Sequence, residues 1–199
     1  MEVRPLQRGE VETASRLLGR AFDHDPVIGS LWMAPRRRRL AFPALFRSLL
    51  HDVVDGGTAY GAFRGRGLAG AAVWMPPAGP EKSAVRARAN ILWLRVLFPR
   101  GTPDVLAMFE RLGHLHPDES HWYLAFVGVD PDVQSRGIGA RLLAPVHERA
   151  DTERVFCYLE TPFSRTHPFY ERLGYRIRQE VRPLEQHGPP VWTMLREPQ

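Results

Sequence analysis

The chain has 199 residues, of which 44% are hydrophobic and 25% are charged, as is usual for soluble globular proteins. This length supports one domain with a full core and argues against two. No segment approaches the run of ~20 apolar residues that would span a bilayer. The N-terminus has no apolar signal core either. We therefore expect a cytoplasmic protein with no membrane partner.

The formal net charge is +5, and Lys82 is the only lysine, so the basic character comes from arginine. This compositional bias is weak evidence for nucleic acid, and it is compatible with an anionic cofactor. The run Arg36-Arg37-Arg38-Arg39 precedes a predicted helix, which favours a solvated helix face over a nucleic-acid contact. We therefore predict no nucleic-acid partner.

The hydropathy pattern predicts a mixed order of helices and strands. In chain order, the predicted elements are a strand over 2–5, helices over 9–22 and from 35 to the Gly56-Gly57 stop, strands over 58–63 and 68–74, helices over 82–97 and 103–112, a strand over 121–129, a helix reaching 149, a strand over 155–161, a short helix over 168–173 and strands over 175–181 and 191–195. The chain has no internal repeat or low-complexity linker. This order indicates one α/β domain over 1–199, with a central sheet and helices on its faces.

A glycine-rich turn joins the strand at 121–129 to the helix that follows it. Gln134, Gly137 and Gly139 lie in this turn, so several backbone N–H groups can converge there without a Cβ in the way. The helix adds its unpaired N–H groups and the positive end of its dipole. No Lys-Ser/Thr pair follows, which excludes a Walker A loop, and the third glycine of a dinucleotide fingerprint is missing. The turn predicts a phosphate or pyrophosphate site.

Two motifs in this order resemble the GCN5-related N-acetyltransferase (GNAT) family. The segment from Val129 to Gly139 is similar to the family's Gln/Arg-x-x-Gly-x-Gly/Ala signature. The segment from Pro168 to Tyr175 is similar to its Phe-Tyr-x-x-Leu-Gly-Phe/Tyr signature. Two separate motifs in the right order are more specific than either alone. Within the family, the likeness is to puromycin N-acetyltransferase-like members, and it covers about 121–195.

The resemblance implies a single-domain GNAT-like α/β fold with a central mixed, mostly antiparallel sheet flanked by helices. It also implies acetyl-CoA as cosubstrate, with no metal, and transfer of the acetyl group to a primary amine of a small molecule. Two alternatives stay open. One is a catalytically silent CoA-binding or sensor domain, and the other is an acetyltransferase for protein N-termini or lysines. A homodimer is left open as well.

The resemblance also assigns the residues that would bind the cofactor. Backbone groups for the pantetheine arm come from Val127, Gly128 and Val129. The pyrophosphate cradle comprises Gln134, Ser135, Arg136, Gly137, Ile138, Gly139 and Ala140. Thr166 and Phe169 complete the set. The family often has asparagine at this position, whereas Thr166 is shorter and offers a single hydroxyl.

Acetyl transfer to an amine needs a proton donor for the departing thiolate and a base for the amine. Tyr170 matches the family tyrosine that protonates the thiolate, and a phenol suits that task because its pKa is near that of a thiol. The alternative is an aromatic side chain that only packs behind Phe169. Glu160, at the end of a strand, is the candidate base, or it forms a structural hydrogen bond or ion pair. Cys157 lies in an apolar strand and is predicted to be inert core, so direct attack by the amine is expected.

Five other polar residues invite a functional interpretation. His114, His116 and His121 have no standard metal-ligand spacing and no accompanying cysteine, so they are predicted to be solvated loop histidines. Asp23 and Asp25 could lie at the acceptor mouth between the first two helices, but Asp in such a break is usually a turn former.

Overall fold

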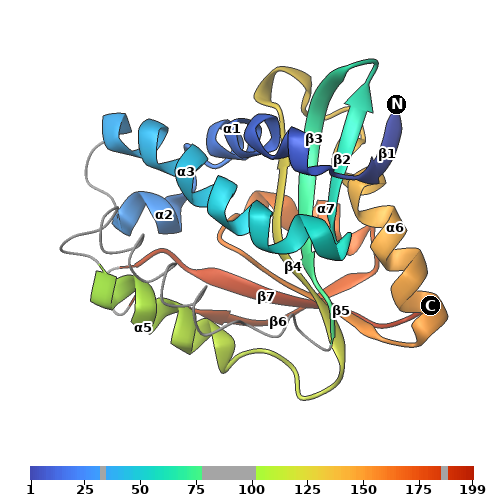
Figure 1. Cartoon of the computed structure of the whole chain (residues 1–199). Helices are drawn as coiled ribbons and strands as arrows, with labels where there is room; N and C mark the ends of the chain where they lie inside the picture. Colours follow the sequence, from blue (N-terminus) through green and yellow to red (C-terminus); the bar gives the residue numbers. More distant parts are fainter. Residues whose placement is uncertain (32–34, 78–101, 185–187) are drawn as a thin grey trace.

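The computed structural model describes residues 1–31, 35–77, 102–184 and 188–199. The helix predicted over 82–97 lies outside the described residues, and so do the side chains of Arg36–Arg39. The elements predicted for the remainder match the observed ones closely (Figure 1).

Seven strands form one sheet in the order β1-β2-β3-β4-β5-β7-β6. Their bounds are β1 Glu2–Pro5, β2 Ala59–Arg64, β3 Gly67–Met75, β4 His121–Val129, β5 Phe156–Thr161, β6 Tyr175–Val181 and β7 Val191–Arg196. The β4–β5 pair is parallel and the other five pairs are antiparallel. The predicted mixed, mostly antiparallel sheet is confirmed.

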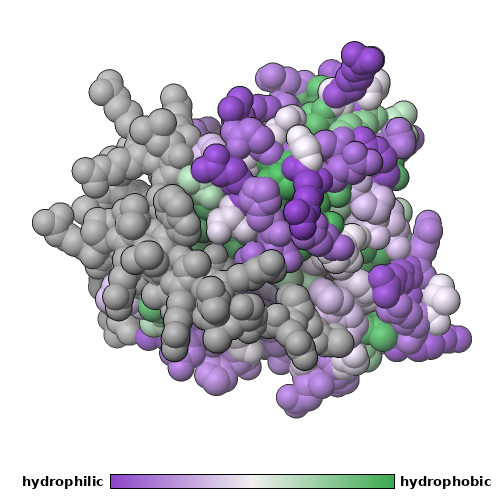
Figure 2. All heavy atoms as spheres, in the orientation of Figure 1, coloured by the Kyte–Doolittle hydropathy of each residue, from purple (hydrophilic) through white to green (hydrophobic). Residues whose placement is uncertain are grey.

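Helices cover both faces of this sheet (Figure 1). Their bounds are α1 Val11–Ala21, α2 Pro26–Leu31, α3 Pro35–Val53, α5 Thr102–Gly113, α6 Ile138–Glu153 and α7 His167–Glu171, with 3-10 turns η1 Arg8–Glu10, η2 Val54–Gly56, η3 Pro131–Val133 and η4 Ser164–Thr166. The sequence did not predict α2. None of the described helices is long and apolar enough to cross a membrane. Most of the described surface on the face shown in Figure 2 is hydrophilic, with small apolar patches between.

The two larger apolar cores of the described residues lie on opposite faces of the sheet, and a small third cluster joins Val27, Met108 and Val191. The first joins α1 and α3 to β2 and β3, and it includes the mutually packed rings of Phe22, Phe46 and Phe126, whose centroids are 5.2–5.8 Å apart. The second places α6 and α7 against β3, β4 and β5. Amphipathic helices thus bury their apolar stripes on both sides of the strands, as the helical spacing of apolar residues predicted.

A β-bulge at Ala125 changes which face the side chains of β4 meet. Val73 of β3 pairs with Phe126, but the next residue, Trp74, pairs with Leu124, so Ala125 is an extra residue. Leu124 and Val127 therefore both face the second core, while Phe126 faces the first. A bulge bends its strand and increases the local twist. It lies at the point where β4 leaves β5.

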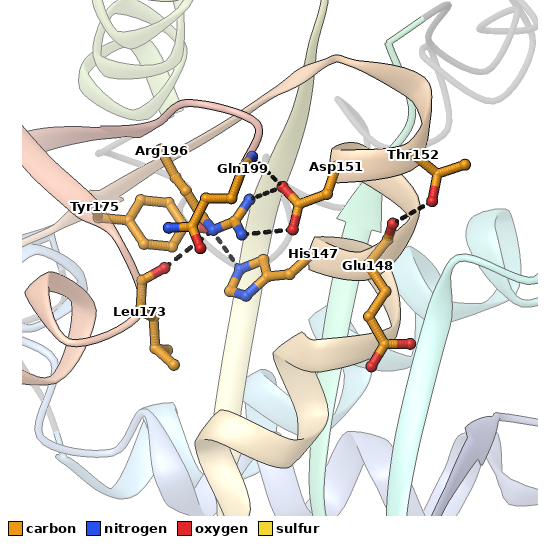
Figure 3. Close-up of polar contacts among 8 residues, drawn as sticks. All are labelled: His147, Glu148, Asp151, Thr152, Leu173, Tyr175, Arg196 and Gln199. Atoms are coloured by element: carbon orange, nitrogen blue, oxygen red, sulfur yellow. Dashed lines mark hydrogen bonds and ion pairs between the residues drawn. The ribbon is translucent and has the colours of Figure 1, made fainter.

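A buried polar network fastens β7 to α6 (Figure 3). Arg196 donates two hydrogen bonds to the Asp151 carboxylate, at 2.6 and 2.7 Å, and a third to the carbonyl oxygen of Leu173 at 3.0 Å. Beside this pair, His147 Nε2 lies 2.9 Å from the Tyr175 hydroxyl. Burial, together with the nearby Arg196 charge, lowers the pKa of His147 to about 4.

His147 makes the stability of the fold depend on pH. In the unfolded chain a histidine titrates near 6.5, but in the folded protein His147 remains neutral to about pH 4. Between these values the unfolded state binds more protons, so stability is lost as the pH falls from 6.5 towards 4, by up to roughly 3 kcal/mol. Urea unfolding across this range measures the slope. His147→Gln should flatten it, and an unchanged slope in that variant would contradict the assignment.

Candidate functional site

The parallel strands β4 and β5 separate at the centre of the sheet. Their pairing runs from His121↔Phe156 to Leu124↔Leu159 and then stops. Beyond that point β4 pairs only with β3, and β5 pairs only with β7. The backbone of β4 from 125 to 129 therefore has no strand partner on its β5 side among the described residues, and Val127, Gly128 and Val129 lie on this open edge.

The glycine-rich turn lies directly beyond that edge, at the start of α6. Gly137 is the N-cap residue of α6, and no side chain caps the helix. The N–H groups of Ile138, Gly139 and Ala140 thus lack intrahelical acceptors and lie at the positive end of the helix dipole. Arg136 is exposed in the same turn and adds positive charge. This arrangement suits a phosphate group.

The turn holds an uncommon backbone conformation. Ser135 has φ +61° and Gly137 has φ +75°, both in the left-handed region. For a residue with a side chain this region costs about 1–2 kcal/mol, so Ser135 stores strain at the candidate site. The Gln134 side chain is directed back to β4, where its Nε2 donates to the carbonyl oxygen of Val129 at 3.1 Å.

Phe169 links this turn to Tyr170. A Cβ added at Gly139 would lie 3.1 Å from Cζ of Phe169, so the aromatic ring of α7 packs closely on the first turn of α6. The Phe169 and Tyr170 rings are 4.9 Å apart in an edge-to-face arrangement. The structure therefore brings the two sequence motifs into contact through these residues.

Tyr170 is 7% exposed, and among the described residues its hydroxyl makes no hydrogen bond. Burial raises its pKa above the usual value of a phenol. The hydroxyl therefore keeps its proton at neutral pH. It has the protonation state of an acid, and no described partner competes for its proton.

Thr166 is engaged within its own loop. Its hydroxyl donates to the carbonyl oxygen of Phe163 at 2.7 Å and lies 3.0 Å from the hydroxyl of Thr161. A hydroxyl has one proton to donate, so Thr166 has only acceptor capacity left for a ligand. The asparagine that the family often has here would offer two more N–H donors.

Glu160 lies one residue beyond the last β4–β5 pair, with a side chain that is 7% exposed. Its Oε2 accepts a hydrogen bond from the Tyr123 hydroxyl at 2.7 Å. Burial raises the pKa of Glu160 to about 7, although the neighbouring hydroxyls of Tyr123 and Tyr158 act to lower it. A carboxyl group with this pKa exchanges protons near neutral pH, as a general base must.

The prediction of solvated loop histidines is wrong for two of the three. His114 is exposed, but His116 and His121 are partly buried and lie 2.9 Å apart, from Nδ1 of the first to Nε2 of the second. His116 Nε2 is 3.6 Å from Oε1 of Glu160. His121 is the first residue of β4 and not part of a loop. His116 therefore borders the candidate base, and His121 contacts His116.

Two further sequence interpretations have structural counterparts. Cys157 is buried in the second core, and burial raises its pKa to about 12, so the inert-core prediction is confirmed.

Asp23 and Asp25 lie in the break between α1 and α2. The backbone N–H of Asp25 donates to the carbonyl oxygen of Phe22, which closes a turn after α1, and the carbonyl oxygen of Asp25 accepts from the N–H of Gly29 at the start of α2. Asp25 is also 5% exposed.

The neighbours of Glu160 could have been found by strand alternation. Trp122 and Leu124 face the second core, so His121 and Tyr123 must face the other side of β4. Tyr158 and Glu160 alternate in the same way on β5, which brings four polar side chains to one face of a strand pair. His116 comes from the loop before β4 and carried no such signal.

We expect Gly137→Ala to weaken CoA binding. An alanine at φ +75° is strained by about 1–2 kcal/mol, so the turn would relax away from the geometry that aims its N–H groups. A loss of this size corresponds to roughly tenfold in affinity. Isothermal titration with CoA measures it. Gly113→Ala, where nothing lies within 4 Å of the added Cβ, is the matched control. Equal affinities in the two variants would contradict the assignment.

A family model supports the same region. The model described as an acetyltransferase (GNAT) domain matches residues 105–177, which run from α5 into β6. An uncharacterized N-acetyltransferase of Schizosaccharomyces pombe is 31% identical over 83 residues, which make up 41% of this chain and 34% of that protein. The chain thus spans about a third of the length of this curated relative.

Solved structures share the whole fold. A histone acetyltransferase-related protein from Corynebacterium glutamicum has a TM-score of 0.69 at 22% identity, with 99% of this chain and 96% of that chain covered. A Drosophila melanogaster polyamine N-acetyltransferase has a TM-score of 0.67 at 17% identity, with 98% and 99% covered. Residues 105–177 are therefore similar in sequence to the acetyltransferase (GNAT) domain, and the whole chain shares its fold with these acetyltransferases.

Proposed function

We propose that this chain is an acetyl-CoA-dependent N-acetyltransferase that acetylates the primary amine of a small molecule, with one catalytic domain over 1–199. The observation that carries the proposal is the contact between Gly139, Phe169 and Tyr170, because it joins a phosphate-binding turn to a protonated phenol. The open edge of β4 leads from that turn to the point where β4 and β5 separate.

The residues present fit acetyl-CoA. The uncapped N-terminus of α6 would hold the pyrophosphate. The open backbone edge over Val127, Gly128 and Val129 would pair with the amides of the pantetheine arm, as an added strand does. When bound, the cosubstrate supplies an acetyl group activated as a thioester. The turn and the strand edge orient it, and Tyr170 meets the charge that develops on sulfur.

Direct attack by the amine is the proposed route. A neutral amine attacks the thioester carbonyl, the C–S bond breaks, and the departing thiolate takes the Tyr170 proton. Tyr170 regains a proton from water before the next turnover. The amine's proton passes to Glu160, directly or through a water molecule. An acyl-enzyme route would need a nucleophile. Cys157 is a poor one because its thiol is buried and its pKa is raised to about 12.

The acceptor is proposed to be a small amine. The Drosophila melanogaster neighbour forms N-acetylagmatine, and the sequence resembles puromycin N-acetyltransferase-like proteins. A panel for this test therefore holds agmatine, a polyamine, an aminonucleoside and a peptide with a free N-terminus. Amine-dependent release of thiol from acetyl-CoA supports the enzyme. Binding of acetyl-CoA without thiol release from any amine would favour the silent sensor, and release with the peptide alone would favour a protein acetyltransferase.

Glu160 as base predicts a specific pH profile. Because its pKa is about 7, kcat/KM should fall as the pH drops through 7 and the carboxylate takes up its proton. Glu160→Gln should abolish this acidic limb and lower kcat about 10²-fold or more. Tyr123→Phe removes a hydrogen bond that stabilises the carboxylate, so the limb should move to higher pH. A wild-type limb retained in Glu160→Gln would exclude Glu160 as the base.

A further inference from the structure

Two hydrogen bonds and one longer polar contact form a series that ends at Glu160, and this series has no role in the function described so far. His121 Nδ1 lies 2.7 Å from the backbone carbonyl oxygen of Glu119. His121 Nε2 lies 2.9 Å from His116 Nδ1. His116 Nε2 in turn lies 3.6 Å from Oε1 of Glu160. The series runs from the exposed segment before β4 to the buried carboxyl group.

The hydrogen bond between His121 Nδ1 and the carbonyl oxygen of Glu119 determines the tautomers of both histidines. A carbonyl oxygen only accepts, so His121 must carry its proton on Nδ1. In neutral His121, Nε2 is then an acceptor, and His116 must donate to it from Nδ1. The lone pair of neutral His116 therefore lies on Nε2, the nitrogen that faces Glu160.

The carboxyl group of Glu160 presents an oxygen atom, Oε1, to His116 Nε2. Oε2 of Glu160 accepts a hydrogen bond from the Tyr123 hydroxyl, whereas Oε1 is buried and has no hydrogen-bond partner among the described residues. An unsatisfied buried carboxylate oxygen is costly. A proton held between Oε1 and His116 Nε2 would relieve that cost. The 3.6 Å separation is long for a hydrogen bond, but catalytic contacts often shorten only when the substrate is bound.

The surroundings favour exchange of one proton between these two groups. His116 packs on the rings of Tyr123 and Tyr158, at 4.6 and 4.7 Å between centroids, and its side chain is 27% exposed. Glu160 is far more enclosed, at 7%. Tyr123, Tyr158 and His116 are the described titratable groups that face Glu160, and Arg178 of β6 acts on Tyr158. His116 is thus the more solvent-accessible end of the pair.

We propose that His116 takes the amine's proton from Glu160 and passes it to solvent, while His121 is a positioning residue that holds His116 in the receptive tautomer. The inference rests on the proposed function and deepens it. In this step the O–H bond of the protonated Glu160 breaks and an N–H bond forms at His116 Nε2. Glu160 becomes a carboxylate again, and the imidazolium of His116 loses the same proton to water. His116 retains its Nδ1 proton, so the pair returns to its starting state.

Nitrogen-15 NMR of histidine-labelled protein tests the geometry without any turnover. We expect neutral His116 to carry its proton on Nδ1. In His121→Phe, which removes the acceptor, His116 should shift towards the Nε2–H tautomer. His114→Gln, which alters an exposed histidine of the same segment, should leave His116 unchanged. A predominant Nε2–H tautomer in the wild type, or no response to His121→Phe, would overturn the proposal.

Kinetics test the proton transfer. His116→Gln should lower kcat about 10- to 100-fold with little change in KM, and added imidazole should restore part of the loss. The same substitution in a Glu160→Gln background should have almost no further effect, because His116 acts through Glu160. A wild-type kcat in His116→Gln, or a full additional loss in the double variant, would overturn the relay. Wild-type protein that shows the expected tautomer yet acetylates no amine would instead contradict the proposed function alone.

Discussion

Tyr170→Phe should lower kcat about 10²-fold or more while the Kd for acetyl-CoA stays nearly unchanged. The loss is expected because the departing thiolate would have no positioned proton donor. The Tyr170 hydroxyl makes no hydrogen bond to any described residue, so its removal should leave the fold and the cofactor contacts intact. Single-turnover thiol release and titration with acetyl-CoA measure the two quantities separately.

Tyr60→Phe is the matched control, because it removes the same hydroxyl from a tyrosine of β2 that belongs neither to the α6 turn nor to α7. It should retain full kcat. Turnover in Tyr170→Phe equal to that of the control would remove Tyr170 from the mechanism. A parallel loss of acetyl-CoA affinity would show that Tyr170 serves mainly to shape the binding site.

Asp151→Ala should destabilise the protein by about 3–5 kcal/mol, because it leaves a buried cation without its partner. The side chain of Arg196 is 5% exposed and makes a two-pronged ion pair with Asp151. Asp151 also accepts a hydrogen bond from the backbone of Gln199. The substitution thus releases both β7 and the C-terminal residue from α6 (Figure 3).

Arg16→Ala provides the comparison, because Arg16 and Glu12 form an exposed pair on α1 with 67% and 47% of their side chains accessible. Exposed pairs of this kind contribute at most about 1 kcal/mol. Urea denaturation of the two variants gives the difference in unfolding free energy. Similar, small losses in both would contradict the structural role assigned to Asp151.

Sequence periodicity predicted most of the fold because apolar residues repeat with the period of the local structure. The helix at Val11–Ala21, for example, follows from the helical spacing of Val11, Ala14, Leu17 and Leu18, all of which are buried. The six residues of α2 carried no such signal, since one short turn is too brief for a period to be read. The bulge at Ala125 also escaped prediction, because a bulge is defined by the partner strand.

The candidate site, like the fold, has parts that the local sequence predicts and parts that depend on residues distant in the sequence. Its glycine turn and the Phe169-Tyr170 segment are local motifs, and the structure brings them into contact. The environment of Glu160 depends on side chains from β4 and from the loop before it. No single stretch of sequence contains that arrangement. The histidines were therefore predicted to be solvated, although His116 borders the carboxyl group and His121 contacts His116.

The activity proposed for this chain is transfer of the acetyl group of acetyl-CoA to a small amine. The most direct test incubates the protein with isotope-labelled acetyl-CoA and the amine panel, and identifies the products by mass spectrometry. The proposal predicts a labelled N-acetyl product from at least one small amine, formed in step with free CoA and lost in Tyr170→Phe. Acetyl-CoA that binds at the start of α6 yet labels no amine would contradict it.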